Sequence, residues 1–349
     1  MRNPNSGELF TDSDDEIAAA LQDVSIPTLL LSCVHMTDDE SVRQSILTGP
    51  LKPAGLFLNE VQGYMSEDDK AAARTLALDI IRDYRDRGCP EPAPIDTVRL
   101  KQMMTWLVAG EVGDEYVPMM LEEMGLDGRD AREGDLHSAP GARAEFPVIV
   151  IGAGESGLLA AIRLHQAGVP YTVIEKNPGV GGTWWENSYP GARVDVGNHF
   201  YCYSFEPSDH WSEFFARQPE LQNYFNDVME RHGVTKHVRF NTEVTEAVWN
   251  DDSGDWALTA RGPEGGTEVL RARAVISAVG QLNQPFVPDL AGAASFAGPA
   301  FHTARWDHSV DLDGKNVVMI GAGATGFQVA PAIADIVGRL TIFQRTAQW

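Results

Sequence analysis

The first third of the chain carries apolar residues at helical spacing. Between residues 12 and 126 they recur every three or four positions, as in residues 71–84 (AAARTLALDIIRDY) and 98–108, and few stretches alternate as strands do. The segment GCPEPAP at 88–94 separates two helices, and the Gly- and charge-rich stretch 125–144 predicts a linker. We therefore expect an α-helical N-terminal module over residues 1–140. Its apolar stripes form its own core or, in part, a contact with a second subunit in a homodimer.

From residue 146 onward the pattern alternates between strands and helices. Apolar runs at 146–151 and 171–175 enclose a helical stretch at 155–166, and the run 274–279 predicts a buried strand of the same sheet. Short alternating runs between 238 and 272, separated by Gly- and Asp-rich turns, predict an antiparallel meander.

A second strand-helix-strand unit is predicted at 316–320, 324–336 and 340–343. The fold class is therefore α/β, with two Rossmann-like dinucleotide-binding domains over residues 146–290 and 316–349, joined by a linker at 291–315. Two strands do not complete such a domain, so the second one is expected to be incomplete here. The missing strands would leave an unpaired sheet edge and uncovered apolar faces.

Two copies of one glycine-rich loop support this organisation. GAGESG occupies residues 152–157 and GAGATG occupies residues 321–326, each after a predicted strand and before a predicted helix. That context is what a G-x-G-x-x-G match requires, because the glycines allow a tight turn and the pyrophosphate binds at the helix N-terminus. A single loop can be a plain turn, whereas two in context predict two dinucleotide sites.

The residue that ends the second strand of each unit distinguishes the two sites. In the first unit it is Glu175, a carboxylate suited to accept hydrogen bonds from a ribose diol, as in FAD or NAD. In the second unit the matching position is Gln344 and Arg345, and a guanidinium can hold the 2′-phosphate of NADPH in a bidentate manner. A solvated arginine near a chain end is the alternative for Arg345.

The charge of the chain excludes some partners. The formal net charge is −23, which argues against nucleic acids and anionic membranes. Residues 1–145 carry 13 basic and 28 acidic side chains, whereas the remainder carries 14 and 22. This difference supports a separate N-terminal module.

Cysteine usage and the N-terminus indicate a cytoplasmic protein. Cys33, Cys89 and Cys202 lie far apart without a C-x-x-C pair, so neither a disulfide framework nor a metal site is expected, and a disulfide reductase is disfavoured. The acidic N-terminus has no apolar core, and no run reaches the roughly 20 apolar residues of a membrane span.

Two segments resemble a known family. Residues 296–307 (FAGPAFHTARWD) match the F-x-G-x-x-x-H-x-x-x-W-[P/D] pattern of Baeyer–Villiger monooxygenases, and residues 181–195 (GGTWWENSYPGARVD) resemble that family's G-G-T-W…Y-P-G-x-R-x-D run, which lies along the flavin. The W-E-N variant and the N-terminal extension look most like the hydroxyacetophenone monooxygenase group, where the extension is associated with dimerisation. Flavin monooxygenases that oxygenate nitrogen or sulfur carry a similar stretch but usually end it differently.

The resemblance implies FAD and NADPH as cofactors and transfers their contacts by position. FAD would be bound by Gly152, Gly154, Gly157, Glu175, Gly182, Thr183, Trp184, Asp195, Tyr201 and, through its backbone, Val244. NADPH would be bound by Gly321, Gly323, Thr325, Gly326, Arg345 and Thr346. Core packing of the aromatic rings is the alternative for Trp184 and Tyr201.

Two residues are expected to act in the reaction. Asp195, a carboxylate among many aromatic residues, needs a partner, which in the family is an active-site arginine expected beyond Trp349. His302 resembles the motif histidine that couples the two dinucleotide domains, with a hydrogen-bonded structural histidine as the equal alternative.

The implied reaction is the insertion of one oxygen atom of O2 into a ketone through a C4a-peroxyflavin, which gives an ester or lactone. Because about half of a typical family member is missing, we expect this sequence to be the N-terminal part of a longer protein, and the chain alone to be inactive. The alternatives are oxygenation of nitrogen or sulfur, and a truncated, non-catalytic chain that binds FAD.

Overall fold

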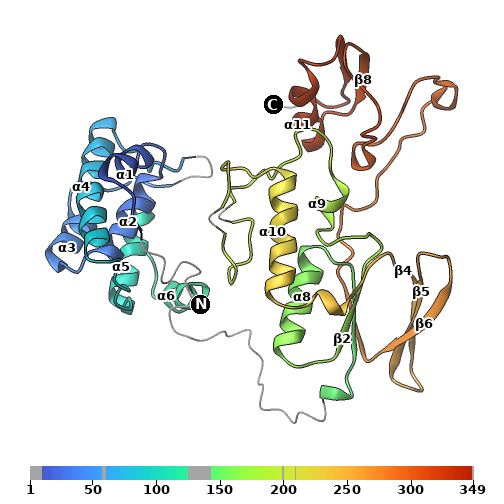
Figure 1. The fold of residues 1–349 in the computed structure, drawn as a ribbon, viewed down its shortest axis with the longest axis horizontal. Helices are drawn as coiled ribbons and strands as arrows, with labels where there is room; N and C mark the ends of the chain where they lie inside the picture. The colour runs from blue at the N-terminus through green and yellow to red at the C-terminus, as the bar shows by residue number, and fades with distance from the viewer. Residues whose placement is uncertain (1–9, 57–59, 125–142, 199, 209, 348–349) are drawn as a thin grey trace. The chain divides into compact units, whose positions relative to one another are not determined.

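The computed structural model describes residues 10–56, 60–124, 143–198, 200–208 and 210–347. The chain divides into two compact units, Met1–Arg132 and Glu133–Trp349, and each is described by itself (Figure 1).

The first unit is helical, as the apolar spacing predicts. Most of its helices begin at a Ser or Asp whose side chain accepts a backbone N–H of the first turn, and Ser13 forms a reciprocal capping box with Glu16. Residues such as Leu30, Ile46 and Ala77 form a common core. The helices are α1 (Asp14–Ala20), α2 (Ile26–Met36), α3 (Glu40–Thr48), α4 (Glu67–Asp86), α5 (Thr97–Leu107) and α6 (Tyr116–Glu123). The predicted linker at 125–144 lies mostly outside the described residues.

The second unit contains a parallel sheet in the order β3-β2-β1-β7. Its strands are β1 (Val148–Ile151), β2 (Tyr171–Ile174), β3 (Val238–Arg239) and β7 (Ala274–Ser277), and β1 pairs with both β2 and β7. The helix α8 (Glu155–Gln166) connects β1 to β2, with the bounds that the sequence predicts. The prediction of 274–279 as a buried strand is only partly correct, because Ala274–Ser277 joins the sheet but is half-buried to exposed.

Helices cover one face of this sheet and an antiparallel meander covers the other (Figure 1). Val148 and Val150 point to α8 and α10 (Gln218–Arg231), whereas Ile149 packs against Leu258 of the meander. Because side chains alternate along a strand, burial of both faces requires a continuous apolar run such as that of β1. The meander consists of β4 (Glu243–Asn250), β5 (Asp255–Arg261) and β6 (Thr267–Ala272).

The prediction of one meander from residue 238 to 272 is wrong at its beginning. Val238–Arg239 forms β3, which pairs with β2 in the parallel sheet. Asn241, with φ of 53°, then turns the chain before β4 begins. The local pattern does not reveal the change of sheet, because apolar and polar residues alternate on both sides of Asn241.

The chain closes with the second strand-helix-strand unit. The strands β8 (Asn316–Ile320) and β9 (Arg339–Phe343) form a parallel pair, and α11 (Ala324–Ile333) connects them. The helix ends before the predicted residue 336. Val318, Ile320 and Phe343 are each about 60% exposed. Short helices of the second unit include α9 (Thr183–Glu186), η1 (Thr235–His237), η2 (Ala293–Ser295) and η3 (Thr303–Arg305).

Candidate functional site

The first glycine-rich loop connects β1 to α8. Gly152 has φ of 101°, in a region that favours glycine, and Gly154 is the N-cap of α8. A Cβ at Gly157 would lie 1.9 Å from the carbonyl oxygen of Gly152, and a Cβ at Gly152 would lie 2.6 Å from the carbonyl oxygen of Ala278. Side chains at these positions would therefore push the loop away from the sheet and helix that hold it.

Glu175 fixes this loop from the end of β2. Its side chain is buried, and its Oε2 and Oε1 atoms accept the backbone N–H groups of Ala153 and Asn177, both at 2.7 Å. An ionised carboxylate has about four lone-pair positions. After these two bonds Glu175 retains acceptor capacity for a ribose diol, so the contact to the loop and the predicted contact to a ligand are compatible.

The segment after the first loop returns to it at Gly182. A Cβ at Gly182 would lie 2.8 Å from the Cα of Gly154, so the two backbones touch. Trp184 follows in α9, is 8% exposed and donates its Nε1–H to the hydroxyl of Tyr201 at 3.0 Å. The two aromatic side chains thus pack on each other edge to face, as the alternative of core packing predicts. Thr183 lies in sequence between the glycine loop and Trp184.

Asp195 lies at the surface of the second unit, with an exposed side chain. The positively charged partner expected from its sequence context remains a prediction. The rings of Trp184 and Tyr201, near it in sequence, contact each other. Burial raises the pKa of Tyr189 and of Tyr201, and the charge of Asp195 raises both further.

The second glycine loop repeats the backbone geometry of the first. Gly321 has φ of 112°, and Gly323 is the N-cap of α11 with φ −76° and ψ −170°, against −74° and −172° for Gly154. A Cβ at Gly326 would lie 2.9 Å from the carbonyl oxygen of Gly321. This loop is open on its outer side, because nothing lies within 4 Å of a Cβ at Gly323.

The remaining residues predicted to contact the two cofactors are half-buried or exposed. Thr325 is half-buried in the first turn of α11, whereas Arg345 and Thr346, just after β9, are exposed. Val244 is half-buried in β4, next to an irregularity in its pairing with β5. These positions leave the side chains of Arg345 and Thr346 accessible to a ligand from solvent.

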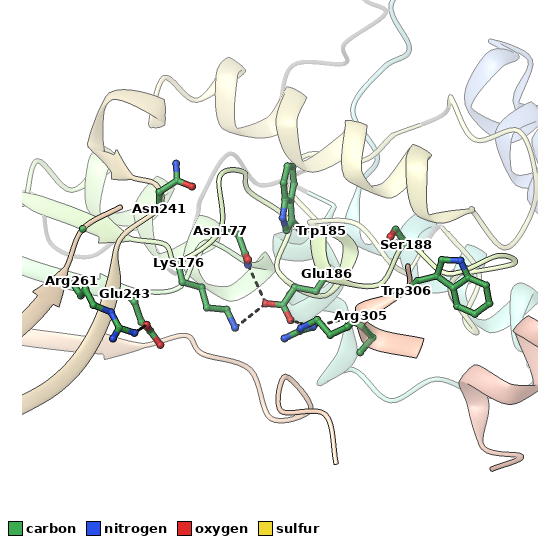
Figure 2. A pocket seen from close by; sticks show the side chains of 12 residues that line it. Lys176, Asn177, Trp185, Glu186, Ser188, Asn241, Glu243, Arg261, Arg305 and Trp306 are labelled. Atoms are coloured by element: carbon green, nitrogen blue, oxygen red, sulfur yellow. Dashed lines mark hydrogen bonds and ion pairs between the residues drawn. The ribbon is translucent and has the colours of Figure 1, made fainter. Parts of the chain in front are cut away.

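The structure adds Glu186, which the sequence argument did not select. Its carboxylate is only 7% exposed and points toward three side chains (Figure 2). Oε1 accepts from Lys176 at 2.9 Å and from Asn177 at 3.1 Å, and Oε2 lies 3.0 Å from the guanidinium of Arg305. Burial raises the pKa of Glu186, but the bonds from Lys176 and Asn177 and the charges of Lys176 and Arg305 outweigh it, so the pKa lies below its ordinary value.

A polar pocket of about 550 Å³ surrounds this cluster (Figure 2). Its walls come from the end of β2, from α9, from β4 and β5 and from the linker motif, including Trp185 and Trp306. Arg305 occupies a variable position of that motif, and only the W-E-N sequence could have drawn attention to Glu186. The ion pair joins residues 119 positions apart, which a local pattern cannot reveal.

His302 has a structural role in the linker. Its Nδ1 accepts the backbone N–H of Ala304 at 3.1 Å and caps the short helix η3. Phe301 and Trp306 pack edge to face across the same turn, with ring centroids 5.2 Å apart. The hydrogen-bonded structural alternative therefore describes the observed contact of His302, whereas a coupling role remains a prediction.

Both loops fit dinucleotides. A Cβ at Gly152, Gly157 or Gly326 would clash with a backbone carbonyl, and Gly321 has a positive φ that favours glycine. Each loop also opens a helix whose first N–H groups favour an anion. The acceptor capacity of Glu175 suits a ribose, and the accessible guanidinium of Arg345 suits a phosphate. The residues present thus match two dinucleotides of different chemistry.

Comparisons with known proteins agree with this geometry. The profile of the flavin-binding monooxygenase-like family matches residues 146–349. An uncharacterized monooxygenase, y4iD, of Sinorhizobium fredii is 38% identical over 334 residues, which are 95% of this chain and 49% of that protein. A Baeyer–Villiger monooxygenase of Streptomyces coelicolor is 44% identical over 204 residues, which are 58% of this chain and 38% of that protein.

Among solved structures, the crystal structure of OTEMO in complex with FAD and NADP matches with a TM-score of 0.55 and 40% identity, over 59% of this chain and 40% of that chain. The chain thus spans about half the length or less of these relatives. In the described part of the chain, no helix is both long and apolar enough to cross a membrane.

Proposed function

This chain belongs to the flavin-binding monooxygenase-like family, and on that premise we propose that it provides the FAD site and the beginning of the NADPH site of a Baeyer–Villiger monooxygenase. Such an enzyme inserts one oxygen atom of O2 into a small-molecule ketone and yields an ester or lactone. The observation that carries the proposal is the pair of glycine loops with matched backbones and unequal strand ends, Glu175 and Arg345.

The first loop binds FAD in this proposal. The α8 N-terminus receives the pyrophosphate, Gly154 and Gly182 allow a close approach of the ligand to the backbone, and Glu175 accepts the ribose hydroxyls. Thr183, Trp184 and Tyr201 form the adjoining wall, and Val244 contributes its backbone. When bound, the flavin supplies the redox chemistry, since it accepts a hydride from NADPH and in its reduced form activates O2.

The second loop binds NADPH. Gly321, Gly323 and Gly326 bring the pyrophosphate to the N-terminus of α11, near Thr325. Arg345, with Thr346 beside it, binds the 2′-phosphate and thereby selects NADPH over NADH. Because the side chain of Arg345 is exposed, it can bind the phosphate without first leaving a buried position.

Asp195 and His302 act around the flavin rather than as general bases. The exposed carboxylate of Asp195 is available to hold a positively charged partner beside the flavin. Fixed positive charge held there would stabilise negative charge that develops beside the flavin, and a closed site would keep out water. His302 stabilises the conformation of the linker through its cap on η3. In this proposal the linker conformation sets the relative position of the two glycine loops.

Oxygenation of nitrogen or sulfur is the second candidate, because the family contains both chemistries. Trp306 followed by Asp307 in the linker motif favours the Baeyer–Villiger reaction. A chain that only binds FAD is the third candidate. The hydroxyacetophenone type and a cytoplasmic location remain predictions from the sequence.

The N-terminal module is proposed to form a homodimer contact. Val98, Tyr116 and Met119 of this module are exposed by 68%, 49% and 48% and are the side chains that we assign to the contact. Removal of residues 1–140 should reduce the mass of the particle in solution to that of a monomer. An unchanged particle stoichiometry would contradict the contact.

Cofactor titrations test the function directly. The purified chain should bind FAD with a perturbed flavin absorbance, and the FAD-loaded chain should bind NADP⁺ far more tightly than NAD⁺. In the whole protein, NADPH oxidation with an aryl ketone should yield an ester. Absence of flavin binding, or equal affinity for both nicotinamide dinucleotides, would contradict the proposal.

A further inference from the structure

Gln328 of α11 makes three hydrogen bonds to the segment that follows α9. Its Oε1 accepts the hydroxyl of Tyr189 at 2.9 Å and the backbone N–H of Arg193 at 3.3 Å. Its Nε2 donates to the backbone carbonyl of Arg193 at 2.9 Å. The amide thus contacts the N–H and the C=O of one residue at once, as a neighbouring strand would.

The backbone around Arg193 is oriented for this contact. On the opposite edge, the N–H of Val194 donates to the carbonyl of Ala216, and the carbonyl of Ala192 accepts from Gln218, in an isolated bridge between Arg193 and Arg217. The polar groups of an extended chain alternate between its two edges. The N–H and C=O of Arg193 therefore face α11, where Gln328 is their partner.

The helix and the segment also touch through their backbones. Gly191 has φ of 83°, and a Cβ there would lie 2.4 Å from the carbonyl oxygen of Gln328 and 3.0 Å from the Cβ of Ala332. Any other residue at Gly191 would move α11 away and would break the contacts of Gln328. A separate hydrogen bond joins Ser188 to His308 at 2.8 Å.

This contact lies between the two proposed cofactor sites. Gln328 comes four residues after Ala324, the first residue of α11, and is thus about 6 Å along the helix from the turn that would bind the pyrophosphate of NADPH. Arg193 precedes Asp195 by two residues, and the segment begins at the wall formed by Trp184. One helix therefore carries a nucleotide at its first turn and holds the proposed flavin segment with its second.

We propose that Gln328 is a positioning residue that couples the two dinucleotide sites, so that FAD bound at the first loop tightens the binding of NADP⁺ at the second. The inference rests on the proposed function. In this proposal FAD orders residues 182–195, and these residues hold α11 through Gln328. The entropy cost of fixing α11 is then smaller when NADP⁺ binds to the helix N-terminus. Coupling of this kind is reciprocal, so NADP⁺ also tightens FAD.

A comparison of affinities tests the coupling without measurement of turnover. The dissociation constant of NADP⁺ is measured by calorimetry on the full chain with and without FAD, for the wild type and for Gln328→Met. Methionine keeps the length and helix propensity of glutamine but removes all three hydrogen bonds. Gln166→Met is the matched control, because Gln166 is exposed at the end of α8.

In the wild type and in Gln166→Met, FAD should tighten NADP⁺ about tenfold, within the range of measured couplings. In Gln328→Met the factor should fall to below about twofold, with little change in NADP⁺ affinity of the FAD-free chain. Tyr189→Phe, which removes one of the three bonds, should give an intermediate factor.

The outcomes separate this inference from the proposed function. If the wild type binds both cofactors but Gln328→Met retains the full factor, or if the wild type shows no coupling, the role of Gln328 is refuted and the function stands. If the wild type binds neither cofactor, both are refuted. Circular dichroism of each variant shows whether the fold is retained, and Tyr189→Phe gives a second test if Gln328→Met unfolds.

Discussion

Replacement of Glu175 by glutamine should weaken both the first loop and its ligand. The carboxylate is 4% exposed and accepts two backbone N–H groups at 2.7 Å, from Ala153 in the loop and from Asn177. Glutamine keeps the shape but presents an amide N–H to one of these donors. A buried N–H group is then left without an acceptor, and the remaining bond loses its charge.

The size of the effect follows from these contacts. A buried donor without a partner costs about 1–3 kcal/mol, and the change from a charged to a neutral acceptor removes about 1 kcal/mol more. The lower cost of burying a neutral group offsets part of this loss. We expect a net loss of about 2 kcal/mol, which lowers the Tm of the unit Glu133–Trp349 by about 4–8 °C, given its size.

The affinity for FAD should fall as well. The ribose loses a hydrogen bond to a charged acceptor, about 1.5–3 kcal/mol, which corresponds to an increase of roughly 10- to 100-fold in Kd. Calorimetric unfolding and FAD titration measure the two effects, with Glu264→Gln, in an exposed turn, as the matched control. An unchanged Tm would refute the anchoring of the loop, and an unchanged Kd in a destabilised variant would refute the ribose contact alone.

Three further predictions follow from the described contacts. Arg345→Ala should raise the Kd of NADPH about tenfold or more and leave that of NADH unchanged, and equal effects in a titration with both would contradict the 2′-phosphate contact. Glu186→Gln should destabilise the chain by about 1–2 kcal/mol at neutral pH, because the variant loses two ion pairs. The effect is no larger because Lys176 and Arg305 are partly exposed. The pKa of Glu186 is lowered in the folded state, so its carboxylate stabilises the fold fully above the unfolded pKa of about 4.3. In thermal unfolding, the stability difference between variant and wild type should vanish as the pH falls through the folded pKa. A stability difference that persists in acid would refute the lowered pKa. Burial raises the pKa of Cys33 to about 12, against about 8.5 in the unfolded chain. Between these values the wild type should lose about 1.4 kcal/mol of folding free energy per pH unit more than Cys33→Ala, as measured by denaturant titration. Parallel pH profiles of the two proteins would exclude a buried neutral thiol.

The sequence predicts the features that depend on local pattern. The helix Glu155–Gln166 and the strand Asn316–Ile320 have the predicted bounds, because each adjoins a loop whose first glycine has a positive φ, a conformation that favours glycine.

The features that the sequence does not predict depend on contacts between distant residues. Gln328 meets Arg193 across 135 positions, and Glu186 meets Arg305 across 119, so no local period indicates either pair. The alternating pattern predicts β3 in the meander, whereas it pairs with β2, because the left-handed turn at Asn241 separates it from β4.

The fate of the oxygen atoms tests the central proposal most directly. The whole protein, loaded with FAD, is incubated with NADPH, an aryl ketone and isotopically heavy O2, and the products are analysed by mass spectrometry. The proposed function predicts an ester or lactone that contains one heavy oxygen atom, with NADPH consumed in equal amount. A product without heavy oxygen, or oxygenation of an amine or sulfide but not of any ketone, would contradict a Baeyer–Villiger monooxygenase.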